Sequence, residues 1–194
     1  MTRKTTRKRA TIIHGYAATP EDHWFGWLAA QLDARGIPAT VPALPDSGAP
    51  DPDRWLAAVA ASVGTPDEGS TLVAHSLGCI TALRHLCSLV GPWRLGALVL
   101  VSGFVDTLPA LPALDPHIGR PLDLARICTH VGRLTLIRSD ADPYVPPGHT
   151  DRLAHLLGTS AQIIPGAGHF LASDGVMSLP AALAAVTSSG PTES

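Results

Sequence analysis

The stretch Thr71-Leu-Val-Ala-His-Ser-Leu-Gly-Cys79 joins a short apolar run to a helical pattern through a serine flanked by small residues. Within it, Ala74-His-Ser-Leu-Gly78 has the form small-x-Ser-x-Gly, which is typical of a nucleophile elbow. In such an elbow a sharp strand-to-helix turn crowds the positions on both sides of the serine, lifts its hydroxyl clear of the sheet and points a helix N-terminus at it. Alone, the motif also fits an ordinary Ser-Gly turn. Assigning Ser76 as a nucleophile therefore requires a base, an acid and an oxyanion hole elsewhere in the chain.

Strand-like and helix-like segments alternate along the rest of the chain. Short apolar or β-branched runs predict six strands, at residues 10–14, 39–44, 71–74, 95–102, 133–139 and 161–164. Capped or amphipathic segments predict helices that begin at Thr19-Pro20 and end before Gly36, and others at residues 51–64, 77–90, 147–157 and 176–186. Continuous apolar strands alternating with such helices indicate an α/β fold, with a mainly parallel sheet covered on both faces.

The composition is that of one globular domain. The chain has 194 residues, of which 45% are hydrophobic and 15% charged, and this length is short for two domains. We expect a single domain over residues 10–188, preceded by a basic disordered tail at 1–9 and followed by a flexible tail at 189–194. The basic tail resembles the start of a signal peptide, but the apolar stretch after it ends at His14 and is too short for one.

The net charge and the cysteines limit the classes of partner and the compartment that we expect for this protein. A net charge of -2 gives the whole protein no electrostatic reason to bind nucleic acid or an anionic membrane. The longest apolar run, around residues 95–105, is far shorter than a membrane span. Cys79, Cys87 and Cys128 are odd in number and lie in core-like patterns, so we expect reduced thiols of a cytoplasmic protein. No metal-binding or nucleotide-binding spacing occurs, so we expect no cofactor.

A base and an acid for Ser76 can be placed after later strands. His169 is the best candidate base, because it lies in a glycine-rich segment between the last predicted strand and the last helix. The loop after the preceding strand offers Asp140 and Asp142 to orient it. We favour Asp142, because Pro143 biases its backbone to an extended form, whereas Asp140 is suited to binding turn amides. The order Ser, Asp, His, each after a different strand, is that of an α/β-hydrolase.

An oxyanion hole needs two backbone N–H groups aimed at the developing charge. We expect one from Leu77, directly after the nucleophile at a helix start, and the other from Tyr16 in the loop after the first strand. Gly15 would let this loop pass close to the substrate. We expect His14 to stabilise the loop by hydrogen bonds rather than to act as a base.

Several other residues are expected to support the fold or to border the site without taking part in catalysis. His75 is expected to point away from the nucleophile and to pack against its neighbours. Trp24, Trp27 and Trp55 stand at helical spacing among apolar residues and are expected in the core. The proline-rich stretch at residues 103–121 follows a strand at the edge where open α/β sheets bind ligands, so we expect it to border a binding site.

Several blocks in order resemble the small lidless serine hydrolases related to retinoblastoma-binding protein nine, the YdeN-like group. They are His14-Gly-Tyr16, Glu21-Asp-His-Trp-Phe-Gly-Trp27, Ala43-Leu-Pro-Asp46, Arg54-Trp55, Ala74-His-Ser-Leu-Gly78, Asp140-Ala-Asp-Pro-Tyr-Val-Pro146 and Gly168-His169-Phe170. The resemblance spans roughly residues 10–186, and its Glu-Asp-His-Trp block is more discriminating than the serine motif. It implies a compact α/β-hydrolase fold without a lid domain and a triad of Ser76, Asp142 and His169. Residues 105–119 do not match the family pattern.

We therefore expect a cytoplasmic serine hydrolase, most specifically a carboxylesterase on small acyl esters. Ser76 would attack the carbonyl and form an acyl-enzyme, His169 would take the proton, and Asp142 would hold the imidazole. The same chemistry serves amides and thioesters. The alternative is a hydrolase-fold scaffold or protein-binding protein with incidental activity, because a fold alone does not fix function. The expected partner is a small acyl ester, not nucleic acid or membrane, with the chain a monomer or homodimer.

Overall fold

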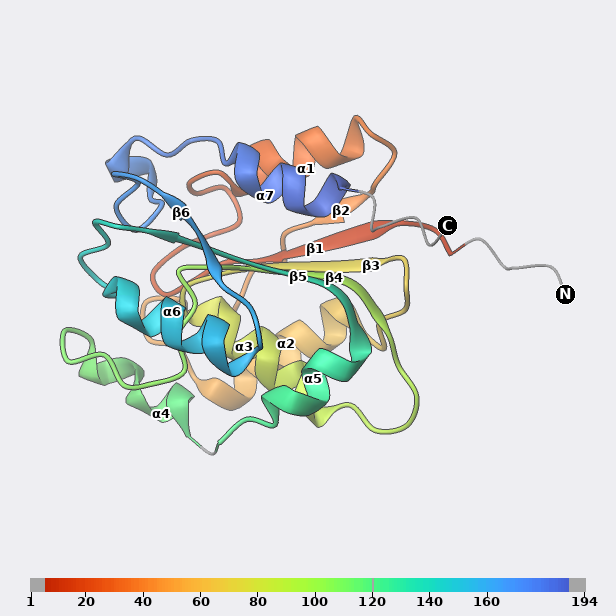
Figure 1. The fold of residues 1–194 in the computed structure, drawn as a ribbon, viewed down its shortest axis with the longest axis horizontal. Helices are drawn as coiled ribbons and strands as arrows, with labels where there is room; N and C mark the ends of the chain where they lie inside the picture. The colour runs from red at the N-terminus through yellow and green to blue at the C-terminus, as the bar shows by residue number, and fades with distance from the viewer. Residues whose placement is uncertain (1–5, 120, 189–194) are drawn as a thin grey trace, which may run out of the picture.

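A six-stranded parallel sheet runs through the middle of the structure, a computed structural model that describes residues 6–119 and 121–188 (Figure 1). The strand order is β2-β1-β3-β4-β5-β6, and every neighbouring pair is parallel. The strands are β1 (Arg9–Ile13), β2 (Ala39–Thr40), β3 (Ser70–His75), β4 (Leu95–Val101), β5 (Val131–Ser139) and β6 (Ala161–Ile164). The predicted α/β fold with six strands is confirmed.

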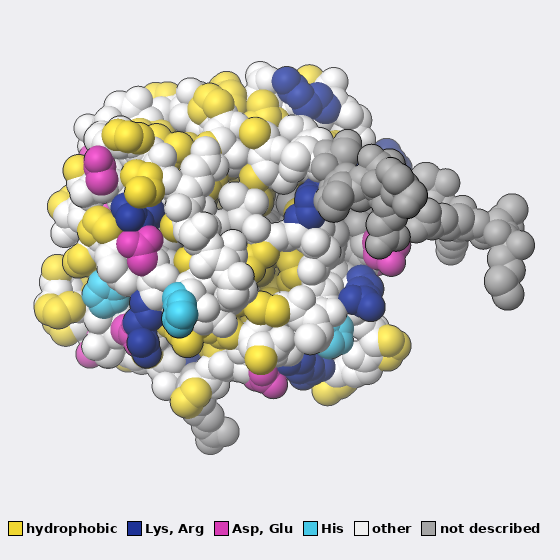
Figure 2. All heavy atoms as spheres, in the orientation of Figure 1, with side chains coloured by type: hydrophobic (Ala, Val, Ile, Leu, Met, Phe, Trp, Pro, Cys, Tyr) yellow, Lys and Arg dark blue, Asp and Glu magenta, His cyan; other side chains and the backbone are white. Residues whose placement is uncertain are grey.

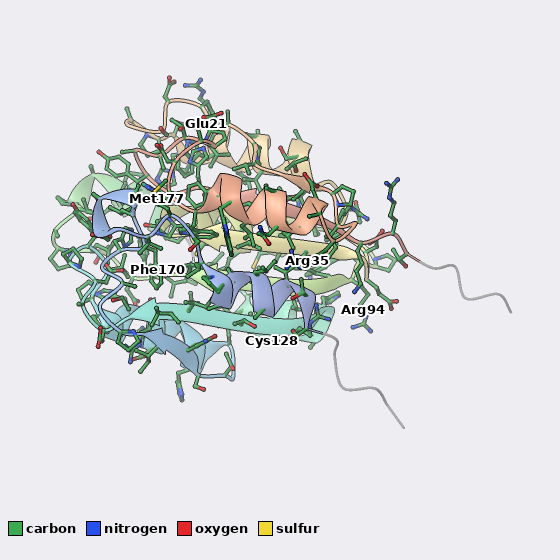
Figure 3. All side chains as sticks on the ribbon, turned by 90° about the horizontal axis from the view of Figure 1, so that it is seen from above. Glu21, Arg35, Arg94, Cys128, Phe170 and Met177 are labelled. Carbon is green, nitrogen blue, oxygen red and sulfur yellow. The ribbon has the colours of Figure 1, made fainter. Side chains whose placement is uncertain are left out.

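Helices cover both faces of this sheet. Helices α1 (Phe25–Asp33) and α7 (Pro180–Thr187) pack side by side on one face, which Figure 3 shows from above. The opposite face carries α2 (Pro52–Val63), α3 (Leu77–Ser88), α5 (Leu124–His130) and α6 (Pro147–Leu156) (Figure 1). The short α4 (Asp115–Ile118) packs against α3, and the 3₁₀ turns η1 and η2 lie at Pro112–Leu114 and Ala172–Asp174.

Alternating strand residues build two cores, because successive side chains of a strand point to opposite faces. In β3, Leu72 and Ala74 pack into the core beneath α2 and α3, whereas Val73 packs into the core beneath α1 and α7. Alternate residues of β4 divide in the same way. Both faces are therefore apolar, which explains why these strands read as continuous hydrophobic runs.

Helix α1 begins at Phe25 and not at the predicted start, Pro20. The Thr19 N–H and hydroxyl both donate to Asp22 Oδ2, at 2.7 and 2.9 Å, and this closes a turn ahead of the helix. His23 then adopts a φ of 55°, a left-handed conformation that a right-handed helix cannot include. The prediction of a helix over this segment is wrong because local side-chain hydrogen bonds compete with it.

Prolines account for two further differences between the predicted and the observed bounds of helices and strands. Helix α7 begins at Pro180 and not at residue 176, because proline favours the first helical position and disfavours a helical conformation at the residue before it, Leu179. Strand β2 ends at Thr40 and not at residue 44, because Pro42 has no N–H for the ladder. Helices α4 and α5 are not among the elements predicted from the sequence. Helix α4 lies within the proline-rich stretch at residues 103–121.

The ends of the predicted domain are only partly described. Arg9, placed in the basic tail by the sequence, lies in β1 and forms an ion pair with Asp67 at 3.0 Å. The tails predicted at residues 1–5 and 189–194 lie outside the described residues. Within the part of the chain that is described, no helix combines the length and the apolar character needed to cross a membrane.

The core predictions hold for some residues and fail for others. Trp24, Trp55 and Cys79 are fully buried, as expected. Trp27 is only partly buried, at the edge of the core beneath α1 and α7. Cys128 is exposed on α5, so its assignment to the core is wrong, and the third cysteine is half-buried. All three thiols are free.

Besides His169, four histidines are buried in the fold, namely His14, His75, His85 and His117. Burial lowers the pKa of each of them. Both ring nitrogens of His117 are buried without a hydrogen-bond partner among the described residues, and its ring packs edge-on against Trp55 at 5.7 Å. These rings are therefore held neutral inside the protein near pH 7.

We expect the protein to lose stability in acid for this reason. An unfolded histidine takes up a proton below a pH of about 6.5, whereas a buried one with a lowered pKa does not. The free energy of unfolding is therefore highest above that pH, and falls by about 1.4 kcal/mol per pH unit for each histidine that stays neutral. Urea unfolding between pH 8 and pH 5 measures this slope, and an unchanged stability over that range would contradict the expectation.

The variant His117→Phe tests the contribution of one of these histidines, which lies away from the sheet edge. It keeps the aromatic contact with Trp55 but removes two unpartnered polar atoms, so we expect a gain of about 1 kcal/mol at pH 8. The acid slope should become shallower than that of the wild type. A loss of stability with an unchanged slope would show that the neutral ring carries no such cost.

Candidate active site

Ser76 sits at a sharp turn between β3 and α3. Its backbone angles are φ 53° and ψ -123°, a conformation that non-glycine residues seldom adopt. Its N–H donates to the Val101 carbonyl of β4 at 2.9 Å, which fixes the turn from the neighbouring strand. At Gly78 a Cβ would overlap the carbonyl oxygen of His14 and lie 2.9 Å from that of Ile13. The turn therefore has the crowded geometry that the small-x-Ser-x-Gly pattern predicts.

The structure brings Ser76, His169 and Asp142 together at the carboxyl edge of the sheet. His169 Nε2 lies 2.9 Å from Ser76 Oγ, and His169 Nδ1 lies 2.7 Å from Asp142 Oδ2. The His169 and Asp142 side chains are only 8% and 2% exposed. If Nδ1 donates to the carboxylate, Nε2 of the neutral ring is left to accept the hydroxyl proton of Ser76.

Four hydrogen bonds hold the Asp142 carboxylate. Oδ1 accepts from the N–H groups of Tyr144 and Val145 at 3.0 and 2.9 Å, and Oδ2 accepts from the Ser102 hydroxyl at 2.8 Å and from His169. Burial raises the pKa of this carboxyl. The hydrogen bond and charge of His169, the Val145 N–H and the Ser102 hydroxyl lower the pKa by more than burial raises it. The net pKa lies below the ordinary value, so the group is an anion at neutral pH that can stabilise positive charge on His169.

The alternative aspartate, Asp140, contacts a different group. Its Oδ1 accepts from the Gly166 N–H at 2.7 Å and so joins two loops at the sheet edge. Of the two aspartates, the one before Pro143 reaches the imidazole.

Sequence reasoning missed Ser102. This wholly buried serine follows β4 directly and adopts a φ of 47°. Its only signal is a hydroxyl at the end of a central strand, at the same sheet edge as Ser76. Its partner, Asp142, is 40 residues away in the sequence, so the contact could not be predicted from local pattern.

The two predicted oxyanion donors border Ser76. Tyr16 lines the same pocket as the serine, and Leu77 is the first residue of α3. Neither backbone N–H has an acceptor among the described residues, so both are available to a ligand. A Cβ on Gly15 would lie 2.9 Å from Ser76 Cβ, which shows how closely this loop passes the serine.

Two further histidines support the loops around the serine. His14 Nε2 accepts from the Leu44 N–H at 3.0 Å and Nδ1 donates to the Gly15 carbonyl at 3.0 Å, so its predicted structural role is confirmed. His75 Nε2 donates to the His169 carbonyl at 2.9 Å. Burial, and then the charge of His169, hold the pKa of His75 well below its ordinary value. His75 packs against its neighbours as predicted, but it also borders the pocket above Ser76.

A pocket of about 220 Å³ opens above Ser76. The residues that line it are Tyr16, Ala17, His23, His75, Ser76, Leu111, Tyr144, His169 and Leu171. Leu111 belongs to the stretch at residues 103–121, which was predicted to border a site. No Lys, Arg, Asp or Glu is among these lining residues, so the pocket suits a small uncharged group. Among the described residues, no cluster of three His, Cys, Asp or Glu side chains is placed to hold a metal ion.

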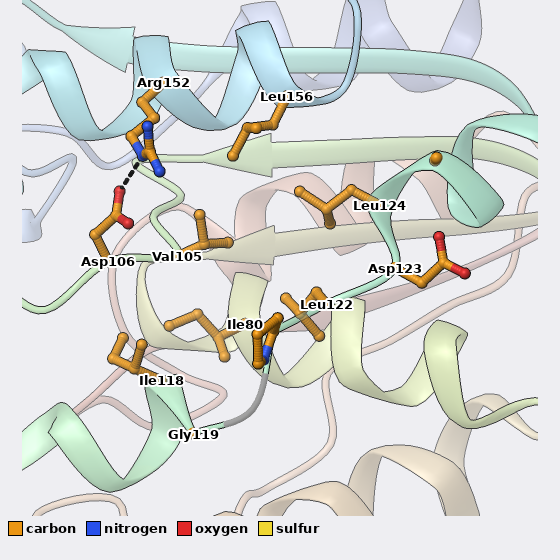
Figure 4. A pocket seen from close by; sticks show the side chains of 12 residues that line it. Ile80, Val105, Asp106, Ile118, Gly119, Leu122, Asp123, Leu124, Arg152 and Leu156 are labelled. Atoms are coloured by element: carbon orange, nitrogen blue, oxygen red, sulfur yellow. Dashed lines mark ion pairs between the residues drawn. The ribbon is translucent and has the colours of Figure 1, made fainter.

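A larger cavity, of about 540 Å³, lies beside α3 (Figure 4). Its walls are mostly aliphatic side chains from α3 to α6, and Asp106 and Arg152 form an ion pair of 2.7 Å at one side. None of Ser76, Asp142 and His169 lines it. The smaller pocket is therefore the one that contains the reactive arrangement.

Comparison with known proteins identifies the family of the chain. The family model described as serine hydrolase matches residues 10–188. The chain is 36% identical over 181 residues to the YdeN protein of Bacillus subtilis (strain 168), covering 93% of this chain and 95% of that protein. The crystal structure of the B. subtilis ydeN gene product superposes with a TM-score of 0.89 at 36% identity, over 93% of this chain and 97% of that one.

A more distant structure shows the fold alone. Est1E from Butyrivibrio proteoclasticus superposes with a TM-score of 0.64 at 14% identity, over 86% of this chain and 82% of that one. The resemblance predicted from the sequence is confirmed by the family match and by the YdeN relative. The chain therefore belongs to the serine hydrolase family, as a YdeN-like hydrolase with the α/β-hydrolase fold.

Proposed function

We propose that the protein is a carboxylesterase that cleaves small acyl esters with Ser76, His169 and Asp142 as its catalytic triad. The observation that carries this proposal is the continuous hydrogen-bond chain from Ser76 Oγ through both ring nitrogens of His169 to Asp142 Oδ2. A buried, ionised aspartate at the end of such a chain is the arrangement that activates a serine hydroxyl.

The chemistry follows from the position of each atom. His169 Nε2 takes the hydroxyl proton as Ser76 Oγ bonds to the carbonyl carbon, and the Tyr16 and Leu77 N–H groups stabilise the oxyanion. The imidazolium then gives its proton to the leaving alcohol, which departs and leaves an acyl-enzyme. Water, deprotonated by His169, releases the acid and restores Ser76. Asp142 keeps the ring in the required tautomer and stabilises its positive charge throughout.

The pocket supports a small neutral substrate. Its volume of about 220 Å³ is below the range of about 300–1,000 Å³ typical of sites for drug-sized ligands. On the face in Figure 2, basic and acidic side chains are scattered, without a broad patch of one sign. We therefore propose a small acyl ester as partner, not nucleic acid or membrane. We also propose that the protein is a cytoplasmic monomer or homodimer.

Labelling with a fluorophosphonate probe tests the nucleophile. The wild type should be labelled at one serine, and the variant Ser76→Ala should lose the label while keeping its urea unfolding midpoint. Equal labelling of the two proteins would refute the assignment of Ser76.

A panel of nitrophenyl esters, anilides and thioesters of the same short acyl groups then tests the reaction class. We expect kcat/KM to be highest for the esters. A folded protein that turns over no member of the panel would favour the scaffold alternative.

A further inference from the structure

His23 stands in the wall of the pocket above Ser76, in a conformation that its sequence context does not favour. It lines the pocket together with Ser76 and His169. Its backbone has a φ of 55°, so the turn formed by Thr19 and Asp22 does not continue directly into α1. Left-handed backbone at a histidine is uncommon and costs energy, which makes this placement worth a functional explanation.

The hydrogen bond of His23 defines which ring nitrogen carries the proton. The Ala172 N–H donates to His23 Nδ1 at 3.0 Å, so this nitrogen is an acceptor and has no proton. In the neutral ring the proton must then lie on Nε2. Burial lowers the pKa of His23 more than the nearby Asp22 carboxylate raises it, which agrees with a neutral ring near pH 7.

The Nε2–H of His23 has no acceptor in the part of the chain that the structure describes. No hydrogen bond from Nε2 to another described residue exists, and this atom is not one of the fully buried, unpartnered side-chain nitrogens. The neighbouring rings of Phe25 and His75 pack against it edge-on, at 5.4 and 6.1 Å, and do not offer an acceptor oxygen. A neutral donor is thus open to solvent on a ring that lines the pocket.

We propose that His23 is a specificity residue whose Nε2–H donates a hydrogen bond to an uncharged acceptor atom in the acyl part of the substrate. The inference rests on the proposed esterase function and narrows its substrate class. The preferred acyl group carries an ether, hydroxyl or carbonyl oxygen beyond the reacting carbonyl. A carboxylate there is disfavoured, because no cationic side chain lines the pocket to pair with it.

Two nitrophenyl esters of nearly equal shape test this proposal. Nitrophenyl methoxyacetate replaces one CH₂ of nitrophenyl butyrate with an ether oxygen, and dividing by hydroxide-catalysed rates removes the difference in intrinsic reactivity. A net neutral hydrogen bond predicts a preference for the methoxyacetate of about 3- to 10-fold in corrected kcat/KM.

The variant His23→Asn separates recognition from loop support. Asparagine tolerates positive φ, and its Oδ1 can replace Nδ1 as acceptor for the Ala172 N–H, but it has no donor at the position of Nε2. We expect its corrected preference to fall to about one, whatever happens to its absolute rates. The matched control is His155→Asn on α6, where the histidine is exposed and is not among the residues that line the pocket; it should keep the wild-type preference.

Each result decides the proposal. A preference present in the wild type and His155→Asn but lost in His23→Asn supports it. A wild type with no corrected preference, or a His23→Asn variant that keeps it, overturns the role of His23 while esterase activity stands. A folded wild type that hydrolyses neither ester and is not labelled at Ser76 removes the proposed function and this inference with it.

Discussion

Replacing Asp142 with asparagine is expected to lower kcat by about 10⁴-fold while leaving the fold intact. The amide oxygen of Asn can still accept from the Tyr144 and Val145 N–H groups that hold Oδ1. Its NH₂ group would then face His169 Nδ1 and require that nitrogen to be the acceptor. The proton would move to Nε2, which then cannot take the proton of the Ser76 hydroxyl.

Asp140→Asn provides the matched control for this experiment. Asp140 is exposed and accepts one N–H bond, from Gly166, which an amide oxygen can also accept. We therefore expect its kcat to stay within about threefold of the wild type. Both variants are measured on one nitrophenyl ester at one fixed pH, with urea midpoints to confirm folding. A similar loss in both variants, or a loss only in Asp140→Asn, would contradict the role assigned to Asp142.

Gly78→Ala is expected to lower the free energy of unfolding by about 3 kcal/mol or more, because a backbone atom cannot yield as a side chain can. The added Cβ would overlap the His14 carbonyl oxygen and lie 2.9 Å from the Ile13 carbonyl oxygen. Relief requires α3 to move away from the loop after β1. That shift moves Ser76 and the Leu77 N–H away from the Tyr16 N–H and disrupts the proposed oxyanion hole, so activity should fall by at least about 100-fold.

Gly26→Ala tests whether the effect comes from the crowded turn and not from alanine itself. Gly26 lies in α1, and a Cβ there meets nothing within 4 Å. Alanine in an exposed helix should therefore raise the free energy of unfolding by about 0.5–1 kcal/mol and leave activity unchanged. Urea unfolding and ester hydrolysis measure both variants. A Gly78→Ala protein as stable and active as Gly26→Ala would show that the turn is less crowded than the structure indicates.

The periodic elements could be predicted from the sequence because their causes are local. Continuous apolar runs gave the strands, and the capping residue Asp51 with Pro52 gave the start of α2, where Asp51 accepts from the Arg54 N–H. The grouping of Ser76, Asp142 and His169 could be anticipated as well, since parallel strands end at one edge and bring the loops after them together. Whether these residues catalyse is the prediction that the variants test.

The remaining features depend on contacts that a local pattern does not encode. Ser102 supports Asp142 through a bond that spans 40 residues of sequence. His23 enters the pocket because the Thr19 to Asp22 hydrogen bonds replace a first helical turn, although that segment has good helix-start residues. In both places a side-chain hydrogen bond and a positive φ override the propensity of the residue.

The long sequence separations within the triad determine when the site can form during synthesis of the chain. A ribosome adds Ser76 well before it adds the loop that contains His169, 93 residues later. Until that loop has emerged and β6 has joined the sheet, the serine lacks its base, and Asp142 has no imidazole to orient. A partly synthesised or truncated chain would thus carry an inert alcohol at this position. The proposed reactivity appears only once the last strand is in place, so hydrolysis is restricted to finished molecules.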